Sequence, residues 1–212
     1  MKLYTYFRSS AAYRVRIALA LKGIDYEAVP VHLLRDGGEQ LKPGYRAVNP
    51  QGLVPALDDG GTLLTQSLAI IEYLEETRPE PPLLPRDPEG RAKVRAVALA
   101  IACDIHPINN LRVLNYLRGP LGQPDERVNA WIKHWVESTL AALEPMVAAT
   151  AGRYCYGDTP TLADLCLVPQ LFNARRFNCD LKDCPTLLRI DAACRDLPAF
   201  KAAAPENQPD AG

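Results

Sequence analysis

The stretch KLYTYFRSSAAYRVRIALALKGIDYEAVPVHL, residues 2–33, decides the fold of the first half of the chain. Residues 2–7 form a short run rich in aromatic side chains, which is typical of a strand. Over residues 13–22 the apolar side chains crowd at helical spacing, and Gly23 follows where a helix commonly ends. Residues 26–33 resemble a second strand. The order strand, helix, strand predicts a right-handed βαβ unit with parallel strands.

A polar stretch follows, and beyond it lies an apolar run at residues 53–57 that contains Pro55. Because proline has no N–H to donate to a ladder, this run is an edge strand, a bulge or the entry to a strand through a cis-proline. Gly60-Gly61 predicts a hairpin turn, and Gln66-Ser67 opens a helix that extends to about Glu76. The first 80 residues therefore predict the order βαβαββα.

The second half of the chain contains no convincing strand. Five prolines lie between residues 79 and 88 and predict a linker. Amphipathic patterns then predict helices over residues 90–118, with a bend or an end near Pro107, and over residues 125–149. Thr161-Leu-Ala-Asp164 is a capping box that opens a third helix. We therefore expect an α/β domain at 1–80, a proline-rich linker at 81–89 and an all-α domain at 90–212.

Charge and cysteine positions exclude several classes of function. Residues 1–80 carry 9 basic and 10 acidic side chains and residues 81–212 carry 15 of each, so neither half has the basic excess of a nucleic-acid binder. All six cysteines follow residue 102 without any C-x-x-C pair, which argues against a dithiol redox centre and a metal site. We find no signal-peptide pattern and no membrane span, and expect a cytoplasmic protein. Chemistry in the first half then uses a non-cysteine residue or a borrowed thiol.

Four blocks of the sequence resemble the zeta class of the glutathione transferases: RSSAAYRVRIAL at 8–19, QSLAIIEYLEE at 66–76, DIHPINNL at 104–111 and GDTPTLAD at 157–164. The resemblance extends from Lys2 to Pro209. It implies the glutathione transferase fold, with a thioredoxin-like first domain and an all-α second domain, and a cytoplasmic homodimer.

The implied activity is a glutathione-dependent cis–trans isomerisation of maleylacetoacetate to fumarylacetoacetate, in aromatic amino acid catabolism, by reversible thiolate addition. Glutathione is then a cofactor that is not consumed, and the substrate is a maleyl keto-diacid. Two alternatives stay open. One is a maleylpyruvate isomerase of gentisate degradation, and the other is a glutathione transferase or dehalogenase acting on halogenated acids.

The residues of the first block explain how a thiol could be activated. Ser9 and Ser10 lie between a strand and a helix, where a hydroxyl and the helix N–H groups can stabilise a sulfur anion. A serine there can also be a plain helix N-cap. Ala11 stands where relatives commonly have cysteine, so a protein thiol is dispensable here.

The resemblance also implies further contacts to glutathione. Gln66 and Ser67 open a helix suited to the γ-glutamyl carboxylate, although N-capping alone would also explain Ser67. In relatives the Val54–Pro55 bond is cis and the valine backbone pairs with the cysteinyl backbone of glutathione. Gln40 resembles a contact to the glycine end. The cofactor-binding residues implied are Ser9, Ser10, Ala11, Arg14, Gln40, Val54, Pro55, Gln66, Ser67, His106, Asn110 and Arg112.

Arginine suits a substrate with two carboxylates because its planar fork pairs bidentately. The candidates are Arg8, Arg14, Arg112, Arg175 and Arg176. Arg8, beside the serines, and Arg176 are the preferred pair, and together with Ser9 and Ser10 they form the predicted catalytic set. Arg175 is the least favoured. His106 and Asn110 share one helix face if Pro107 permits a continuous helix, and His106 is either a titrating group or a structural residue.

Overall fold

The structure is a computed structural model that describes residues 1–211 of the 212. The chain forms two compact units, Met1–Leu83 together with residues 196–211, and Leu84–Arg195. Within the described residues, every helix is too short or too polar to cross a membrane. Residues 196–211 were expected in the all-α domain, whereas in the structure they belong to the first unit. They belong to the first unit because α10 (Pro198–Ala203) packs against α1 (Ser10–Leu21).

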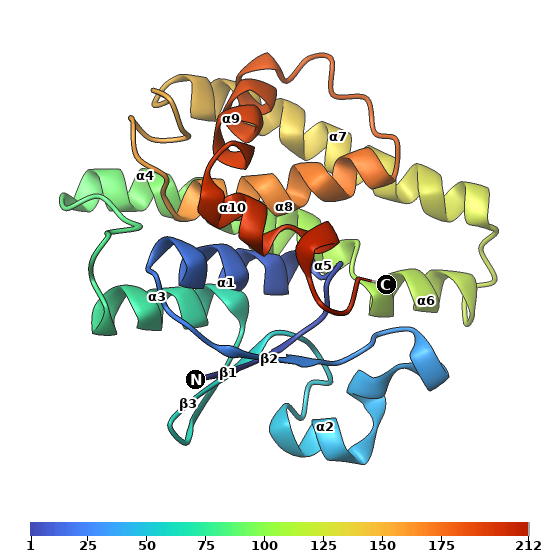
Figure 1. Ribbon diagram of the computed structural model, residues 1–212. Coiled ribbons are helices and arrows are strands. Elements are labelled where there is room, and N and C mark those ends of the chain that lie inside the picture. The colour runs from blue at the N-terminus through green and yellow to red at the C-terminus, as the bar shows by residue number, and fades with distance from the viewer. Residues whose placement is uncertain (212) are drawn as a thin grey trace. The chain divides into compact units, whose positions relative to one another are not determined.

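The first unit is built on a four-stranded sheet with the strand order β2-β1-β3-β4 (Figure 1). The strands are β1 (Lys2–Thr5), β2 (Glu27–Pro30), β3 (Ala56–Asp59) and β4 (Thr62–Thr65). β1 and β2 are parallel, and β3 is antiparallel to both β1 and β4. Helices α1 and α3 (Ser67–Thr77) lie on one side of this sheet and α2 (Pro43–Val48) on the other (Figure 1). The predicted α/β fold of the first half is confirmed.

Two short 3₁₀ helices, η1 (Arg35–Gly37) and η2 (Glu39–Leu41), connect β2 to α2. The strand ends differ slightly from the prediction: β1 stops at Thr5 because residues 7 and 8 lie in a turn. α1 begins at Ser10, three residues earlier than its apolar pattern suggests, because Ser9 caps it. Of the three options that Pro55 left open, the structure has the cis Val54–Pro55 bond immediately before β3.

The segment that follows α3 is held in place by a buried lysine side chain. The side chain of Lys22 is fully buried, and its Nζ donates to Glu75 Oε2 (2.9 Å), to the Arg78 carbonyl (2.8 Å) and to the Pro81 carbonyl (2.9 Å). Glu75 also accepts from the Leu83 N–H. These bonds tie the end of α1 to the residues that follow α3.

The second unit is helical, as predicted (Figure 1). Its helices are α4 (Pro88–Leu99), α5 (His106–Ile108), α6 (Leu111–Arg118), α7 (Asp125–Ala148), α8 (Leu162–Arg176) and α9 (Pro185–Arg195), with a π-helical segment η3 (Ala100–Ile105) between α4 and α5. α8 lies at the centre of this unit and packs against α4, α7, α9 and η3. The capping box is present: Asp164 Oδ2 accepts from the Thr161 N–H at 2.8 Å.

The helix predicted over residues 90–118 is interrupted. α5 ends at Ile108, and Asn110 has an extended backbone (φ −68°, ψ 149°) because it is the N-cap of α6. His106 and Asn110 therefore do not share one face of a continuous helix. The predicted end near Pro107 is confirmed, whereas the apolar spacing alone did not show that a new helix begins after Asn110.

All six cysteines are free thiols. Four of them are buried, whereas Cys103 on η3 is exposed and Cys179 is half-buried. Among residues 1–211 no group of three or more His, Cys, Asp or Glu side chains could hold a metal ion.

Candidate functional site

The first part of the site is the turn that joins β1 to α1. The Ser9 N–H donates to the Tyr6 carbonyl (2.9 Å), which closes a tight turn around Phe7 and Arg8. Ser9 is the N-cap of α1, and its Oγ accepts from the Ala12 N–H at 3.2 Å. A serine oxygen that accepts a bond still has its own O–H to donate. The capping role and a thiolate-stabilising role of Ser9 are therefore compatible.

The neighbours of Ser9 add charge and enclosure to this turn. Ser10 is buried in the first turn of α1, and Ala11 next to it is half-buried. Arg8 is half-buried, and its guanidinium donates to the Tyr6 hydroxyl (3.2 Å) and lies 4.9 Å from the centre of the Phe7 ring. The turn thus brings a cationic side chain next to the serine pair at a helix N-terminus, where the helix dipole favours an anion.

The second part of the site is the N-terminus of α3. Gln66 precedes this helix with φ +70°, a backbone region that non-glycine residues rarely adopt and that is frequent at functional sites. Its Nε2 donates to Gln51 Oε1 at 2.9 Å. Ser67, the first residue of α3, is 6% exposed and accepts from Nη1 of the buried Arg14 at 3.3 Å. Since Arg14 has only donors, the Ser67 hydroxyl proton stays available for an acceptor.

Two further predicted residues lie in the segments between β2 and β3. Val54 is buried and forms an apolar cluster with Tyr6, Val31 and Tyr45. Gln40, in η2, is 8% exposed and its Nε2 donates to the Leu33 carbonyl (3.3 Å). Its Oε1 is buried and has no hydrogen-bond partner among residues 1–211. A buried acceptor without a donor is costly, so this oxygen suits a ligand N–H.

The remaining predicted residues belong to the second unit. His106, Asn110 and Arg112 follow one another around the junction of α5 and α6, where the Asn110 side chain accepts from the Arg112 N–H at 3.2 Å. Asn110 thus has a structural role as an N-cap, which its position in the sequence did not predict. Its amide nitrogen is left to donate. His106 is half-buried, and the Arg112 side chain is exposed.

The two arginines at the end of α8 differ in their surroundings. Arg175 donates to Asp191 Oδ2 at 2.6 Å and so connects α8 to α9. This ion pair gives Arg175 a structural function, in line with its low rank among the diacid-binding candidates. Arg176 is the last residue of α8, is exposed, and lies over the Phe177 ring at 4.7 Å from its centre.

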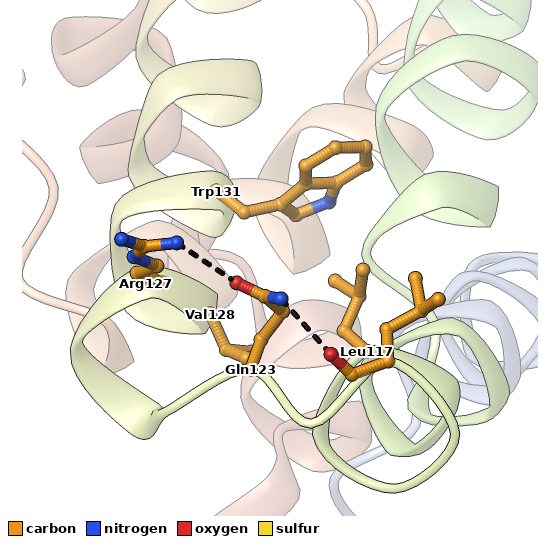
Figure 2. A pocket seen from close by; sticks show the side chains of 6 residues that line it. Leu117, Gln123, Arg127, Val128 and Trp131 are labelled. Atoms are coloured by element: carbon orange, nitrogen blue, oxygen red, sulfur yellow. Dashed lines mark hydrogen bonds between the residues drawn. The ribbon is translucent and has the colours of Figure 1, made fainter.

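A cavity of about 310 Å³ lies within the second unit between the end of α6 and the start of α7. Figure 2 shows Leu117, Val128 and Trp131 around it, with Arg127 donating to Gln123. None of the predicted site residues lines this cavity. Its apolar walls and single cation do not suit a substrate with two carboxylates.

The comparisons with known proteins agree with the geometry of the first unit. Residues 3–82 match the family described as glutathione S-transferase, N-terminal domain. The chain is 55% identical over 209 residues to the probable maleylacetoacetate isomerase of Vibrio cholerae. The alignment covers 99% of this chain and 97% of that protein.

Two solved structures are similar over the full length of both chains. A holo maleylpyruvate isomerase, described as a bacterial zeta-class glutathione S-transferase, has a TM-score of 0.97 at 52% identity. A maleylacetoacetate isomerase from Methylobacterium extorquens AM1, with bound malonate and glutathione, has a TM-score of 0.96 at 45% identity.

Proposed function

The chain belongs to the zeta-class glutathione transferases, in the family of the maleylacetoacetate and maleylpyruvate isomerases, and we propose that it isomerises maleylacetoacetate to fumarylacetoacetate with glutathione as cofactor. The observation that carries this proposal is the full-length identity of 55% to a maleylacetoacetate isomerase. The resemblance inferred from the four sequence blocks is thereby confirmed. The roles of individual residues below are part of the proposal.

Glutathione fits the polar groups of the first unit. A tripeptide with a thiol, two carboxylates and two amide N–H groups needs anion sites at its ends and acceptors between them. The helix N-termini at Ser9 and Ser67 suit the two kinds of anion, and the unpaired Oε1 of Gln40 suits an amide N–H. Val54 and Pro55, at the cis bond, would offer backbone groups to the middle of the peptide.

When bound, glutathione supplies a thiolate that adds reversibly to the cis double bond. The carbon–carbon bond is then single and can rotate, and loss of the thiolate restores the double bond in the trans form. The chain's task is to keep the sulfur ionised. The hydroxyl of Ser9 or Ser10 would donate a hydrogen bond to the sulfur anion, with Ala11 in the same helical turn. Gln66, Ser67 and the buried Arg14 would hold the γ-glutamyl carboxylate at the other helix.

The substrate needs cationic partners for its carboxylates. Arg8 would bind one of them and offset the charge that develops on the diketone, because it lies next to the serines. From the second unit, Arg176 would bind another carboxylate, while His106, Asn110 and Arg112 would contact the cofactor. The malonate in the Methylobacterium extorquens relative supports a dicarboxylate as the substrate class.

Stoichiometry tests the proposed function. With maleylacetoacetate and a small amount of glutathione, we expect many turnovers, followed by absorbance, without loss of free thiol. Thiol loss that equals turnover would instead indicate a transferase or dehalogenase, and would overturn the isomerase proposal.

Maleylpyruvate is the second candidate substrate, because the maleylpyruvate isomerase structure is so similar to this chain. The two substrates differ only beyond the diketone. A comparison of kcat/KM decides between them, and a higher value for maleylpyruvate would assign the enzyme to gentisate degradation.

We also propose a cytoplasmic homodimer. The six free cysteines suit a reducing compartment. The exposed apolar side chains of Leu63 and Leu99 suit burial against a second copy of the chain. Light scattering of the purified protein should give twice the monomer mass, and a monomer mass would contradict the dimer.

A further inference from the structure

The peptide of Phe7, in the turn that carries the serines, is held on both sides by charged side chains from other parts of the first unit. Asp210 Oδ2 accepts from the Phe7 N–H at 3.0 Å, across 203 positions of sequence. Nη2 of Arg16 donates to the Phe7 carbonyl at 2.9 Å. Phe7 is a central residue of the tight turn closed by Ser9, so these two bonds fix the turn from which Ser9 and Ser10 project.

Arg16 can hold the turn in place because its side chain is completely buried and each of its three guanidinium nitrogens donates a hydrogen bond. It also donates to Thr5 Oγ1 (3.1 Å), to the Tyr6 carbonyl (3.3 Å) and to the Ala203 carbonyl (3.0 Å). Burial lowers the pKa of its guanidinium to about 10, against the opposing charge of Asp210 and two tyrosines, so it remains a cation at neutral pH. One side chain therefore joins β1, the serine turn and α10.

Asp210 reaches the turn because the segment before it is fixed. Gln208 Nε2 donates to the Ala202 and Ala204 carbonyls (both 2.9 Å), which folds the chain back after η4 (Pro205–Asn207). The second oxygen of the Asp210 carboxylate is buried and has no hydrogen-bond partner within residues 1–211. Asp210 as a whole is half-buried, and a buried carboxylate oxygen without a donor is costly to keep, unless the bond of the other oxygen to the Phe7 N–H acts on the turn itself.

We infer that Asp210 is a positioning residue for the thiolate site: together with Arg16 it sets the conformation of the serine turn and thereby the direction of the serine hydroxyls. This inference rests on the proposed use of glutathione and goes beyond it, because no residue of 196–211 was expected to take part. Its physical basis is that hydrogen bonds to a charged sulfur depend steeply on direction and distance. A small shift of the turn would weaken them without changing the rest of the fold.

The experiment compares Asp210→Ala and Asp210→Asn with the wild type by titrating the ultraviolet absorbance of the bound glutathione thiolate against pH. Asp210→Ala removes the acceptor, and we expect the thiolate fraction at neutral pH and kcat to fall by about tenfold. Asp210→Asn keeps an acceptor of the same shape, and we expect near wild-type values. Glu206→Ala, an exposed acidic residue of the same segment, is the matched control and should change neither value.

The sign of the effect separates positioning from simple charge. Loss of a nearby negative charge alone would favour the thiolate, so both Asp210 variants would then raise the thiolate fraction. That result, or an unchanged fraction in Asp210→Ala, or equal loss in both variants, overturns the inference. Thermal melting of each variant checks the fold, because a merely structural role would lower Tm but leave the thiol titration unchanged. A wild type without a thiolate signal would instead refute the proposed use of glutathione.

Discussion

Substitution of Ser9 tests whether one hydroxyl both caps α1 and stabilises the thiolate. In the structure Ser9 Oγ accepts from the Ala12 N–H at 3.2 Å, so Ser9→Ala removes a cap. Loss of an N-cap serine costs about 1 kcal/mol of unfolding free energy. For a chain of this size that corresponds to a decrease in Tm of roughly 2–4 °C.

The effect on the thiolate should be larger than the effect on stability. A hydrogen bond to a charged group contributes about 1.5–3 kcal/mol, and a factor of ten corresponds to about 1.4 kcal/mol. Ser9→Ala should therefore lower the acid dissociation constant of the bound glutathione thiol by roughly 10- to 100-fold, and with it the thiolate fraction at neutral pH. The assay is the same ultraviolet titration, together with kcat/KM for maleylacetoacetate as a function of pH.

Ser9→Asp separates the two roles. Aspartate is as good an N-cap as serine, so Tm should stay near the wild-type value. Its negative charge beside the sulfur disfavours a second anion, so the thiolate and the activity should be lost. If Ser9→Ala lowers Tm but keeps the wild-type thiolate fraction, the reasoning is refuted, Ser9 is a cap only, and the hydroxyl donor would be Ser10.

Three further predictions concern buried or exposed side chains. Arg14→Met should raise KM for glutathione about tenfold with a smaller change in kcat, because Ser67 loses its buried donor; a fall in kcat at unchanged KM would contradict this. Lys22→Met leaves the carboxylate of Glu75 without its buried cation and should cost about 3 kcal/mol in urea unfolding, whereas a loss below about 1 kcal/mol would contradict a buried pair. In the native protein Cys103 should react first with a disulfide reagent, because it is exposed while Cys179 is half-buried and the other four cysteines are buried. The fast phase of the reaction should vanish in Cys103→Ser.

The sequence predicts the parts of the fold whose signals are local. The βαβ stretch, the Gly60-Gly61 turn and the Thr161 capping box each depend on neighbouring residues, and all appear in the structure. Pro107 predicted an end of the helix near that residue, and α5 does end at Ile108, but the start of a new helix at Asn110 was missed, because an asparagine that caps a helix looks the same in a periodic pattern as one on a helix surface. Only the backbone angles separate the two.

In the candidate site, too, local features could be predicted from the sequence and contacts between distant residues could not. The two helix N-termini could be found from sequence, because Ser9 lies next to the helix that it caps and Ser67 is the first residue of α3; the predicted N-capping by Ser67 is wrong, since Gln66 holds the N-cap position. The donor to Ser67 is Arg14, 53 positions away, and the partner of Phe7 is Asp210, 203 positions away. No spacing rule within one sequence connects residues that far apart, so these two contacts became visible only in the folded chain.

The two buried arginines of α1 give a chain of net charge −1 a way to build the cationic site that we propose. Positions two apart in a helix point about 200° away from each other, so Arg14 and Arg16 can both be buried only if α1 is covered on opposite sides. It is: α3 and α10 both pack against it. Arg14 thus reaches the N-terminus of α3, while Arg16 reaches back to the turn before Ser9.

Arg14 donates to the Ser67 hydroxyl and Arg16 donates to hydroxyl and carbonyl oxygens, so both guanidinium groups carry their positive charge into a medium of low dielectric constant. That charge adds to the dipoles of two helix N-termini, which both favour an anion. The charge of the whole protein is therefore a poor guide to its ligand. A single helix with buried cations on two sides supplies a local potential suited to a thiolate at one end and a carboxylate at the other.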